Sequence, residues 1–305
     1  MQLHKIIVIL SFLFLGLFLK SLIQRETLKT KTSLILNNII IYICLPALIL
    51  KIIPTLEVKE DSWVYPLSHW FSLLVLAVLT YIVSKACKLE RKTIGCLLIL
   101  VPLGNTSFLG YPMVEVFFGS KALPYAILYD QMGSFLALAL YSPLILFIYG
   151  QEKSPSLVKL VKKIGGFLPL LALLASILFK DFFLKERIQK IVSLLSYGVI
   201  PLAMTALGLQ LKKPSKGLGI PLIIGLSFKM ILSPIITFFF FKILGGFNTP
   251  EKVVIFQSAM PPMITAGILA SEKGLQKSLC LNLISVGLLF SFIVLPVCYC
   301  LLQLF

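Results

Sequence analysis

The chain is poor in charge and in histidine. Only 13% of its 305 residues are charged, twelve are acidic and two are histidine, whereas 58% are hydrophobic. In soluble globular domains about a quarter of the residues are charged, so water cannot be the only solvent of this chain. The six cysteines form no CxxC pair and have no neighbouring histidine. We therefore expect neither a metal site nor another cofactor.

The sequence also lacks the motifs of a membrane enzyme. It contains no HExxH, no GxGD pair and no GxSG-type serine with a histidine. Hydrolysis inside a membrane needs such residues at membrane depth, and the two histidines, His4 and His69, lie at the edges of apolar runs. We therefore predict that the protein is not an enzyme, and we interpret His69 as an interfacial residue rather than a proton relay.

The excess of basic residues does not indicate a nucleic-acid partner. The formal net charge is +16, but the Lys and Arg residues stand between the apolar runs and form no recognition helix. Loops on the cytoplasmic side of a membrane are enriched in Lys and Arg, and their distribution here favours both termini outside. We expect a multi-pass protein of the cell membrane, plasma or inner, with its N-terminus outside and the lipid bilayer as its surroundings.

Apolar runs long enough for membrane helices recur along the whole chain. A bilayer core of about 30 Å needs roughly 20 apolar residues per helix. The predicted spans are residues 6–23, 34–50, 64–84, 93–118, 122–149, 164–180, 188–211, 218–243, 251–271 and 279–304. The predicted fold class is all-α and transmembrane, with about ten helices.

The two halves of the chain resemble each other. At an offset of 155 residues the ten spans fall into five pairs, and the residues that align identically include Tyr42 with Tyr197, Pro46 with Pro201, Pro66 with Pro221 and Gly119 with Gly274. An odd number of spans in each copy means that the second copy enters the membrane from the opposite side. We predict two inverted five-helix repeats, residues 1–150 and 156–305, an architecture typical of secondary transporters.

Two spans carry helix-breaking residues at matching places in the repeat. Span four contains Pro102, Gly104, Asn105, Thr106, Ser107, Gly110 and Pro112, and span nine contains Gln257, Ser258, Pro261, Pro262 and Gly267. Proline removes a backbone donor and clashes with the preceding turn, so both helices should unwind and free peptide groups. Such breaks in both halves point to a substrate site. The alternative is that these prolines only kink packed helices.

The stretch from Gly104 to Pro112, GNTSFLGYP, followed by Phe118 and Gly119, resembles the signature of the auxin efflux carrier family of permeases. Other segments are similar to that family in the same order: Leu45 to Ile49, Tyr129 with Asp130, Pro201 to Ala203 with Gly208, and Ala259 to Pro261. The resemblance covers nearly the whole chain, although the long central loop of some plant members is missing.

This resemblance implies a ten-helix carrier in which spans one, two, six and seven form a scaffold. Spans three to five and eight to ten would form a transport domain, and the broken fourth and ninth helices would cross within it. Members of the family move organic anions such as auxin-like or dicarboxylic acids and often form homodimers through the scaffold. We therefore predict a secondary active transporter of a small organic anion that works by alternating access.

We place three charged residues at membrane depth and assign the others to loops and to the ends of spans. Glu115 follows Pro112 by about one turn, Asp130 lies near the start of span five, and Lys229 lies near the middle of span eight. A charge at membrane depth is costly unless it is paired or neutralised. We predict that Asp130 or Glu115 carries a coupling proton and that Lys229 binds the anionic substrate. A structural ion pair between Lys229 and one of these carboxyl groups is the alternative.

The predicted substrate-binding residues lie at or near the two breaks: Asn105, Thr106, Pro112, Pro261, Pro262, Lys229 and Asn282. For Asn282, polar packing between helices is the alternative interpretation. The oxygen atoms of the breaks would also suit sodium as the coupling ion. A sodium-coupled organic-anion symporter of the bile acid type therefore stays open, as does a membrane sensor that does not transport.

Overall fold

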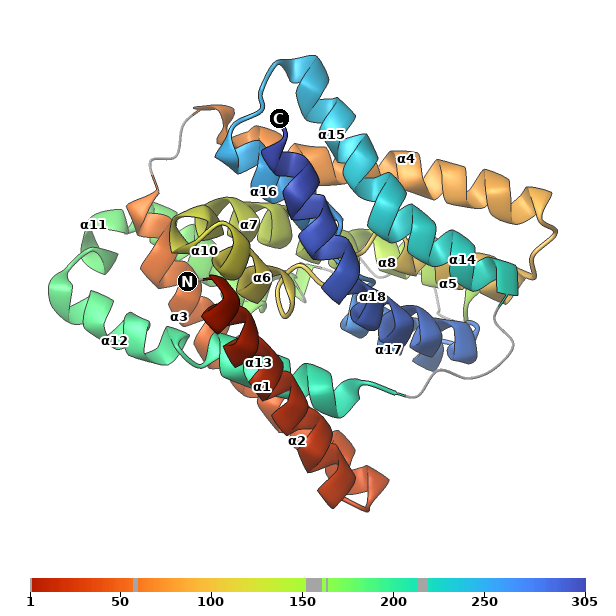
Figure 1. Cartoon of the computed structure of the whole chain (residues 1–305), viewed down its shortest axis with the longest axis horizontal. Coiled ribbons are helices and arrows are strands. Elements are labelled where there is room, and N and C mark those ends of the chain that lie inside the picture. Colours follow the sequence, from red (N-terminus) through yellow and green to blue (C-terminus); the bar gives the residue numbers. More distant parts are fainter. Residues whose placement is uncertain (1, 57–59, 152–160, 163, 213–218) are drawn as a thin grey trace. The chain divides into compact units, whose positions relative to one another are not determined.

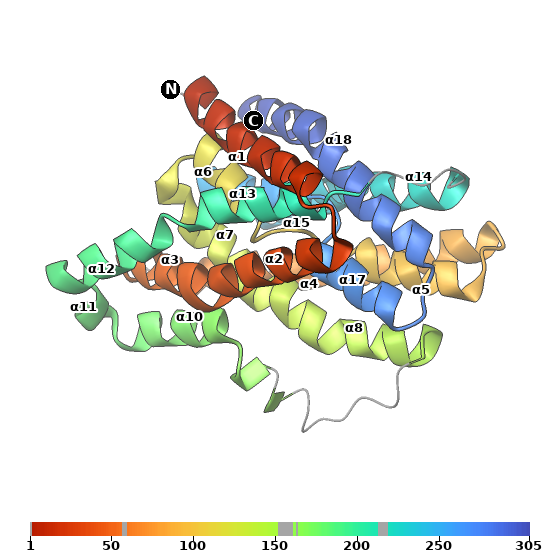
Figure 2. The same ribbon diagram turned by 90° about the horizontal axis from the view of Figure 1, so that it is seen from below.

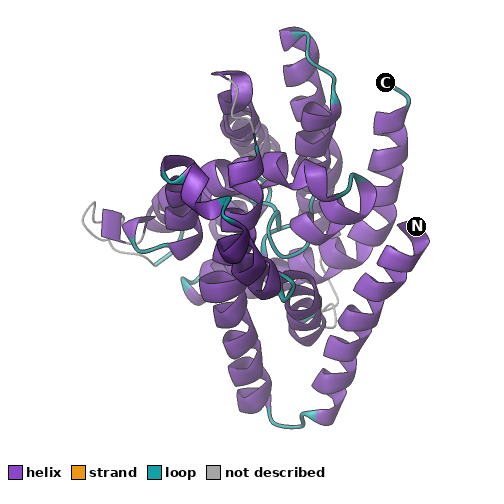
Figure 3. Ribbon diagram, turned by 90° about the vertical axis from the view of Figure 1, so that its left-hand side faces the viewer, coloured by secondary structure: helices purple, strands orange, loops and turns teal. Residues whose placement is uncertain are grey.

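The computed structural model describes residues 2–56, 60–151, 161–162, 164–212 and 219–305. Within these residues every regular element is a helix, and Figure 3 shows helices joined by loops, without a strand. The chain divides into two compact units. Unit 1 comprises Met1–Ser62, Ser107–Ile127 and Ile164–Leu211, and unit 2 comprises Trp63–Thr106, Leu128–Lys163 and Lys212–Phe305.

The helices of unit 1 come from three separate stretches of the chain. They are α1 (Gln2–Leu22), α2 (Glu26–Ile39), η1 (Ile40–Cys44), α3 (Leu45–Ile52), η2 (Ile53–Thr55), α6 (Gly110–Phe117), η4 (Ser120–Ala122), α10 (Leu168–Leu178), α11 (Lys180–Phe183), α12 (Glu186–Ser196) and α13 (Val199–Gln210). The helix α7 (Leu123–Tyr129) begins in this unit and ends in unit 2.

Unit 2 is also assembled from three stretches. Its helices are α4 (Val64–Ala86), α5 (Arg91–Leu100), η5 (Asp130–Phe135), α8 (Leu136–Tyr149), α14 (Gly219–Ser227), η6 (Phe228–Leu232), α15 (Ser233–Leu244), α16 (Thr249–Ser258), α17 (Ile264–Glu272) and α18 (Lys277–Gln303). The remaining turn, η3 (Glu60–Trp63), leads into α4.

Among the described residues, six helical segments are long and apolar enough, by length and composition, to cross a membrane: Glu26–Thr55, Val64–Ala86, Ser120–Tyr149, Glu186–Gln210, Gly219–Leu244 and Lys277–Gln303. The apolar helices Ile7–Leu22 and Leu168–Leu178 are shorter. Helical segments overlap each predicted span, and two of these spans are interrupted. A multi-pass membrane protein follows, while the arrangement as ten spans in two inverted repeats stays a prediction.

Many large apolar side chains lie on the surface, as expected for a protein in a bilayer. Leu178, Leu194 and Ile243 are 74%, 72% and 83% exposed. Apolar surface in water costs about 25 cal/mol per Å², and lipid tails remove this cost. The bilayer therefore takes the place that a solvated polar face has in a soluble helical protein.

Proline positions explain two of the wide helical turns. The π-helical turns η1 and η6 each end two residues before a proline, Pro46 and Pro234. The proline ring clashes with the carbonyl group four residues earlier, and an extra residue in the preceding turn relieves that clash. The second of these turns carries Lys229, so Pro234 widens the helix at the position of this buried cation.

In unit 1, α1 and α13 run side by side, as Figures 1 and 2 both show. The hydroxyl of Thr205 donates to the carbonyl oxygen of Phe12 at 3.4 Å, and the amine of Lys20 donates to the carbonyl oxygen of Leu211. Contacts that advance in the same direction along both helices mean that the two helices are parallel. Between these bonds, Gly16 faces Gly208 so closely that a Cβ on either glycine would lie 2.9 Å from the Cα of the other. Small residues of this kind let membrane helices approach backbone to backbone.

We expect Gly208→Ala to destabilise unit 1 by about 2 kcal/mol or more, because overpacking a tight contact typically costs 1–3 kcal/mol. The added methyl would meet backbone atoms of α1, which cannot rotate away as a side chain would. The measurement is thermal unfolding of the purified protein in detergent. Gly165→Ala is the matched control, since nothing lies within 4 Å of a Cβ at Gly165. Equal unfolding temperatures for the two variants would contradict this account of the helix pair.

In unit 2, α5 forms the centre of the hydrophobic core. All of its residues from Thr93 to Leu100 are buried, and they pack against apolar residues of α4, α8, α14, α17 and α18. A helix that is apolar on every side must be enclosed by other helices or by lipid. Enclosure by neighbouring helices holds the C-terminal end of α5, where the helix breaks, at a defined place in the unit.

Candidate functional site

The two predicted interruptions are present, and within unit 2 their backbones pair with each other. α5 ends at Leu100 and α16 ends at Ser258, and α17 begins only at Ile264. The N–H of Asn105 donates to the carbonyl oxygen of Pro261 at 2.8 Å, and the N–H of Met263 donates to that of Leu103 at 3.0 Å. Gly104 and Pro262 form an antiparallel bridge between these bonds. We call the segments 101–106 and 259–263 the paired breaks.

Lys229 lies against the paired breaks. It is 1% exposed, and its amine donates to the carbonyl oxygen of Ser258 at 3.2 Å. This carbonyl belongs to the last residue of α16, where helical carbonyl groups lose their intrahelical partners. A buried ammonium group is costly unless anions or several hydrogen bonds compensate it. The arrangement therefore favours an anion at this place.

Gly104 makes room for the Lys229 amine. A Cβ at Gly104 would lie 3.0 Å from Nζ of Lys229 and 3.1 Å from its Cε. Distances in that range are tighter than ordinary van der Waals contact, so any larger residue would push the lysine away. The absence of a side chain at Gly104 thus allows one cation to lie near both breaks, because Ser258 precedes one break and Gly104 belongs to the other.

Asp130 forms a second polar group next to the first break. The hydroxyl of Thr106 donates to Oδ1 of Asp130, and Nε2 of Gln131 donates to Oδ2 at 2.7 Å. The side-chain amide of Gln257 donates to the carbonyl oxygen of Thr106 at 3.2 Å. Both carboxylate oxygens are therefore held by neutral donors, and Gln257 of α16 ties the group to the other broken helix.

Asn105, Thr106 and Asp130 are buried in unit 2. Asn282 is also buried, on α18. Five residues further along α18, a Cβ at Gly287 would lie 2.8 Å from Pro262 and 3.3 Å from Pro261. The structure thus brings the predicted residues of both breaks together with Lys229 and Asp130, and it places α18 beside the prolines.

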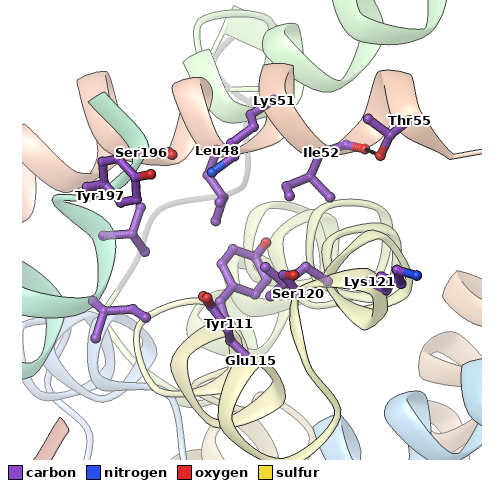
Figure 4. Close-up of a pocket in the computed structure, with 13 residues that line it drawn as sticks. Leu48, Lys51, Ile52, Thr55, Tyr111, Glu115, Ser120, Lys121, Ser196 and Tyr197 are labelled. Carbon is purple, nitrogen blue, oxygen red and sulfur yellow. Dashed lines mark hydrogen bonds between the residues drawn. The ribbon is translucent and has the colours of Figure 1, made fainter. Parts of the chain in front are cut away.

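Two predicted site residues, Pro112 and Glu115, belong to unit 1 instead. Pro112 lies after the first break, in the helix that resumes. It is the third residue of α6, in the first helical turn, where a missing N–H costs no intrahelical bond. Glu115 lies one turn further along α6 and lines a cavity of unit 1 (Figure 4).

His69, which the sequence places near the start of a span, is enclosed by other helices. Its side chain is buried, and its ring meets the ring of Tyr129 edge-on with centroids 5.1 Å apart. The physical reason is close packing of α4 on η5, where Gly133 has no side chain to hold the helices apart. A Cβ at Gly133 would lie 2.7 Å from the Cβ of His69. Distance from the end of a span therefore did not predict burial here.

From the sequence, Gly104 and Ser258 were predicted only as parts of the two interrupted helices. Their further roles, as the space for the Lys229 amine and as its acceptor, depend on pairing between distant segments. The sequence did indicate that Lys229 needs hydrogen-bond acceptors, because it lies near the middle of a span. It also indicated that the breaks would supply free carbonyl groups at that depth. Nothing in the sequence specified which acceptor it meets.

Comparison with known proteins agrees with these features. A family model described as Membrane transport protein matches residues 1–158 and 164–299. The chain belongs to this family. The match confirms the resemblance to the auxin efflux carriers, and it covers segments of both units of this membrane transport protein.

Two archaeal relatives are similar over nearly their full lengths. The chain is 29% identical over 301 residues to an uncharacterized transporter of Methanocaldococcus jannaschii, and the alignment covers 95% of each chain. It is 26% identical over 299 residues to an uncharacterized transporter of Methanothermobacter thermautotrophicus, with 96% of each chain covered. Family and relatives together support a transporter.

Proposed function

We propose that this membrane transport protein is a secondary active transporter of a small organic anion, an auxin-like or dicarboxylic acid. The observation that carries the proposal is the buried Lys229 amine beside the paired breaks. A substrate carboxylate would meet this ammonium group at a place where helix termini also present polar backbone groups. The first N–H groups of α17 add the positive end of a helix dipole.

Alternating access requires one part of the protein to move the site while another part stays in place. We propose unit 2 as the moving transport domain and unit 1 as the scaffold. The division of the chain supports this in part. Predicted spans one, two, six and seven lie in unit 1, and spans three, eight, nine and ten lie in unit 2, whereas spans four and five are divided between the two units. We further propose that homodimers form through unit 1, and that the N-terminus lies outside the cell membrane.

Asp130 is the group that we propose as the carrier of a coupling proton, with Glu115 as the second candidate. Low dielectric disfavours a charged carboxylate, and a carboxyl group that loads and releases a proton can couple transport to a proton gradient. A sodium-coupled symporter of the bile acid type is the alternative. The oxygen atoms of Thr106 and Asp130 are close together and are of the type that sodium prefers.

Transport by the purified protein in liposomes tests this function. Labelled organic acids are offered under an imposed proton gradient, an imposed sodium gradient or neither. Uptake that follows the proton gradient is the expected result, and uptake that follows only sodium would favour the symporter. Binding without any uptake or exchange would indicate a sensor and would contradict the proposal.

We expect Asn105→Ala to lower transport about tenfold, since a lost hydrogen bond in a buried site typically costs 1–3 kcal/mol. Folding should be largely retained, because the bond from Asn105 to Pro261 uses the backbone N–H. The measurement is initial uptake of labelled acid at equal protein content, with the exposed Asn38 of α2 changed to Ala as the control. Unchanged uptake in a well-folded Asn105→Ala protein would exclude its amide from the site.

A further inference from the structure

Unit 1 contains a cavity of about 270 Å³ that the proposed transport cycle does not explain. It lies between α3, the α6–α7 segment and the junction of α12 with α13, and Figure 4 shows the residues that line it. Ligand pockets of proteins range from about 300 Å³ upward for drug-sized molecules. A cavity of this size suits a ligand with only a few non-hydrogen atoms.

Three charged residues line this cavity: Lys51, Lys121 and Glu115. The salt bridges found among the described residues join Lys29 with Glu26 and Lys190 with Glu186, and none involves the cavity. Lys51 and Glu115 are partly buried, and the Lys51 amine lies over the ring of Tyr197, 5.2 Å from its centroid. Partly buried charges without protein counter-ions are costly in a membrane protein, so they point to a charged ligand.

Two of the hydroxyl groups at the cavity donate within their own helices. Thr55 donates to the carbonyl oxygen of Ile52 at 2.7 Å, a bond drawn in Figure 4, and Ser196 donates to that of Ser193 at 2.8 Å. These hydroxyl protons serve their own helices. The lysine amines are the positively charged donors for an anion, and Lys51 belongs to the membrane helix α3.

Part of the wall is apolar. Leu48 and Ile52 of α3 and Val199 of α13 are buried residues that line the cavity, together with Leu123 and the partly exposed Ile200. This part of the wall can hold a short hydrocarbon body. The Glu115 carboxylate also lines the cavity and would repel a second anionic group of the ligand.

We propose that this cavity binds a small monocarboxylate with an apolar body. The carboxylate meets Lys51, with Lys121 at the rim, and the hydrocarbon part lies against Leu48, Ile52 and Val199. Glu115 limits the ligand to one negative charge. The site differs from the proposed transport site, because its residues belong to unit 1, whereas Lys229 and the paired breaks belong to unit 2. It shares only Glu115, the second candidate for the coupling proton, with the proposed function.

Equilibrium binding to the purified full-length protein in nanodiscs tests the proposal. The probes are labelled hexanoate and labelled adipate, which have the same number of carbons but one and two carboxylates. Lys51→Gln is expected to weaken hexanoate binding about tenfold, the loss typical of a charge-assisted hydrogen bond. The exposed Lys190→Gln of the same unit changes the net charge equally and should leave the affinity unchanged.

The second variant tests the role of the Glu115 carboxylate. The expected result is a gain in affinity, which a misfolded protein would not show. Glu115→Gln is expected to strengthen adipate binding about tenfold relative to hexanoate, with the exposed Glu186→Gln as its control. Hexanoate affinity within twofold of the parent in Lys51→Gln would overturn the proposal.

Four further outcomes support or contradict this binding site. If the affinity for adipate relative to that for hexanoate were unchanged in Glu115→Gln, the proposal would be contradicted. It would also be contradicted if anionic lipid, but no unlabelled monocarboxylate, displaced labelled hexanoate. Loss of all hexanoate binding in Lys229→Gln would place the ligand at the paired breaks instead. Hexanoate binding that survives Lys229→Gln supports the cavity, and it does so whether or not the protein transports.

Discussion

Lys229→Gln is expected to weaken binding of the transported anion by about 10- to 100-fold, the cost of losing a charge-assisted hydrogen bond in a buried site. The lysine is buried and its amine contacts the carbonyl group that ends α16. The positive charge that Lys229→Gln removes is therefore not replaced by a cation from solvent. The measurement is competition of unlabelled organic acids against a labelled one at equilibrium. Stability should be kept or improved, because a neutral amide is less costly to bury than an ammonium group.

Two comparisons separate charge from structure at this position. Lys242→Gln removes an exposed lysine of α15 and should leave affinity unchanged. Gly104→Ala keeps the charge but adds a methyl group 3.0 Å from the amine, so it should weaken binding by displacing Lys229. If Lys229→Gln lowered the unfolding temperature without changing affinity, Lys229 would be a structural residue.

Asp130→Asn is expected to abolish the response of transport to a pH gradient while exchange at equal pH continues. One coupled proton can drive about tenfold accumulation per pH unit, and an amide that cannot titrate removes this coupling. The local structure should tolerate the change. The Thr106 hydroxyl can still donate to the side-chain oxygen of an asparagine. The Gln131 amide nitrogen lies 2.7 Å from Oδ2 of Asp130, where the asparagine would carry its NH₂ group, and Gln131 can rotate its amide so that its oxygen accepts from that group.

The measurement is uptake of labelled acid into liposomes with an acidic exterior, compared with exchange at equal pH inside and outside. Asp181→Asn, an exposed carboxylate of α11, is the control for the change in net charge. Continued accumulation by Asp130→Asn would assign coupling elsewhere, with Glu115→Gln as the next variant to measure. A parent protein that ignores pH and follows sodium would remove proton coupling altogether.

The positions of the breaks could be predicted because proline and glycine act on their own turn of helix. Pro102, Gly104, Pro261 and Pro262 weaken a helix wherever it is placed, so α5 and α16 end near them. Pro112 was assigned to the same break by its proximity in the sequence. It lies in the first turn of α6, where proline is compatible with a helix.

Helix length, apolar composition and the membrane environment were properties of the amino-acid sequence alone, because each depends on neighbouring residues and on transfer from water to lipid. The pairing of Asn105 with Pro261, the acceptor of the Lys229 amine and the burial of His69 were decided by the tertiary structure. Each of these depends on contacts between segments that are far apart in the chain. Glu115 shows the same limit, since its spacing from Pro112 was known from the sequence, but the cavity that it lines is formed by helices from three separate stretches.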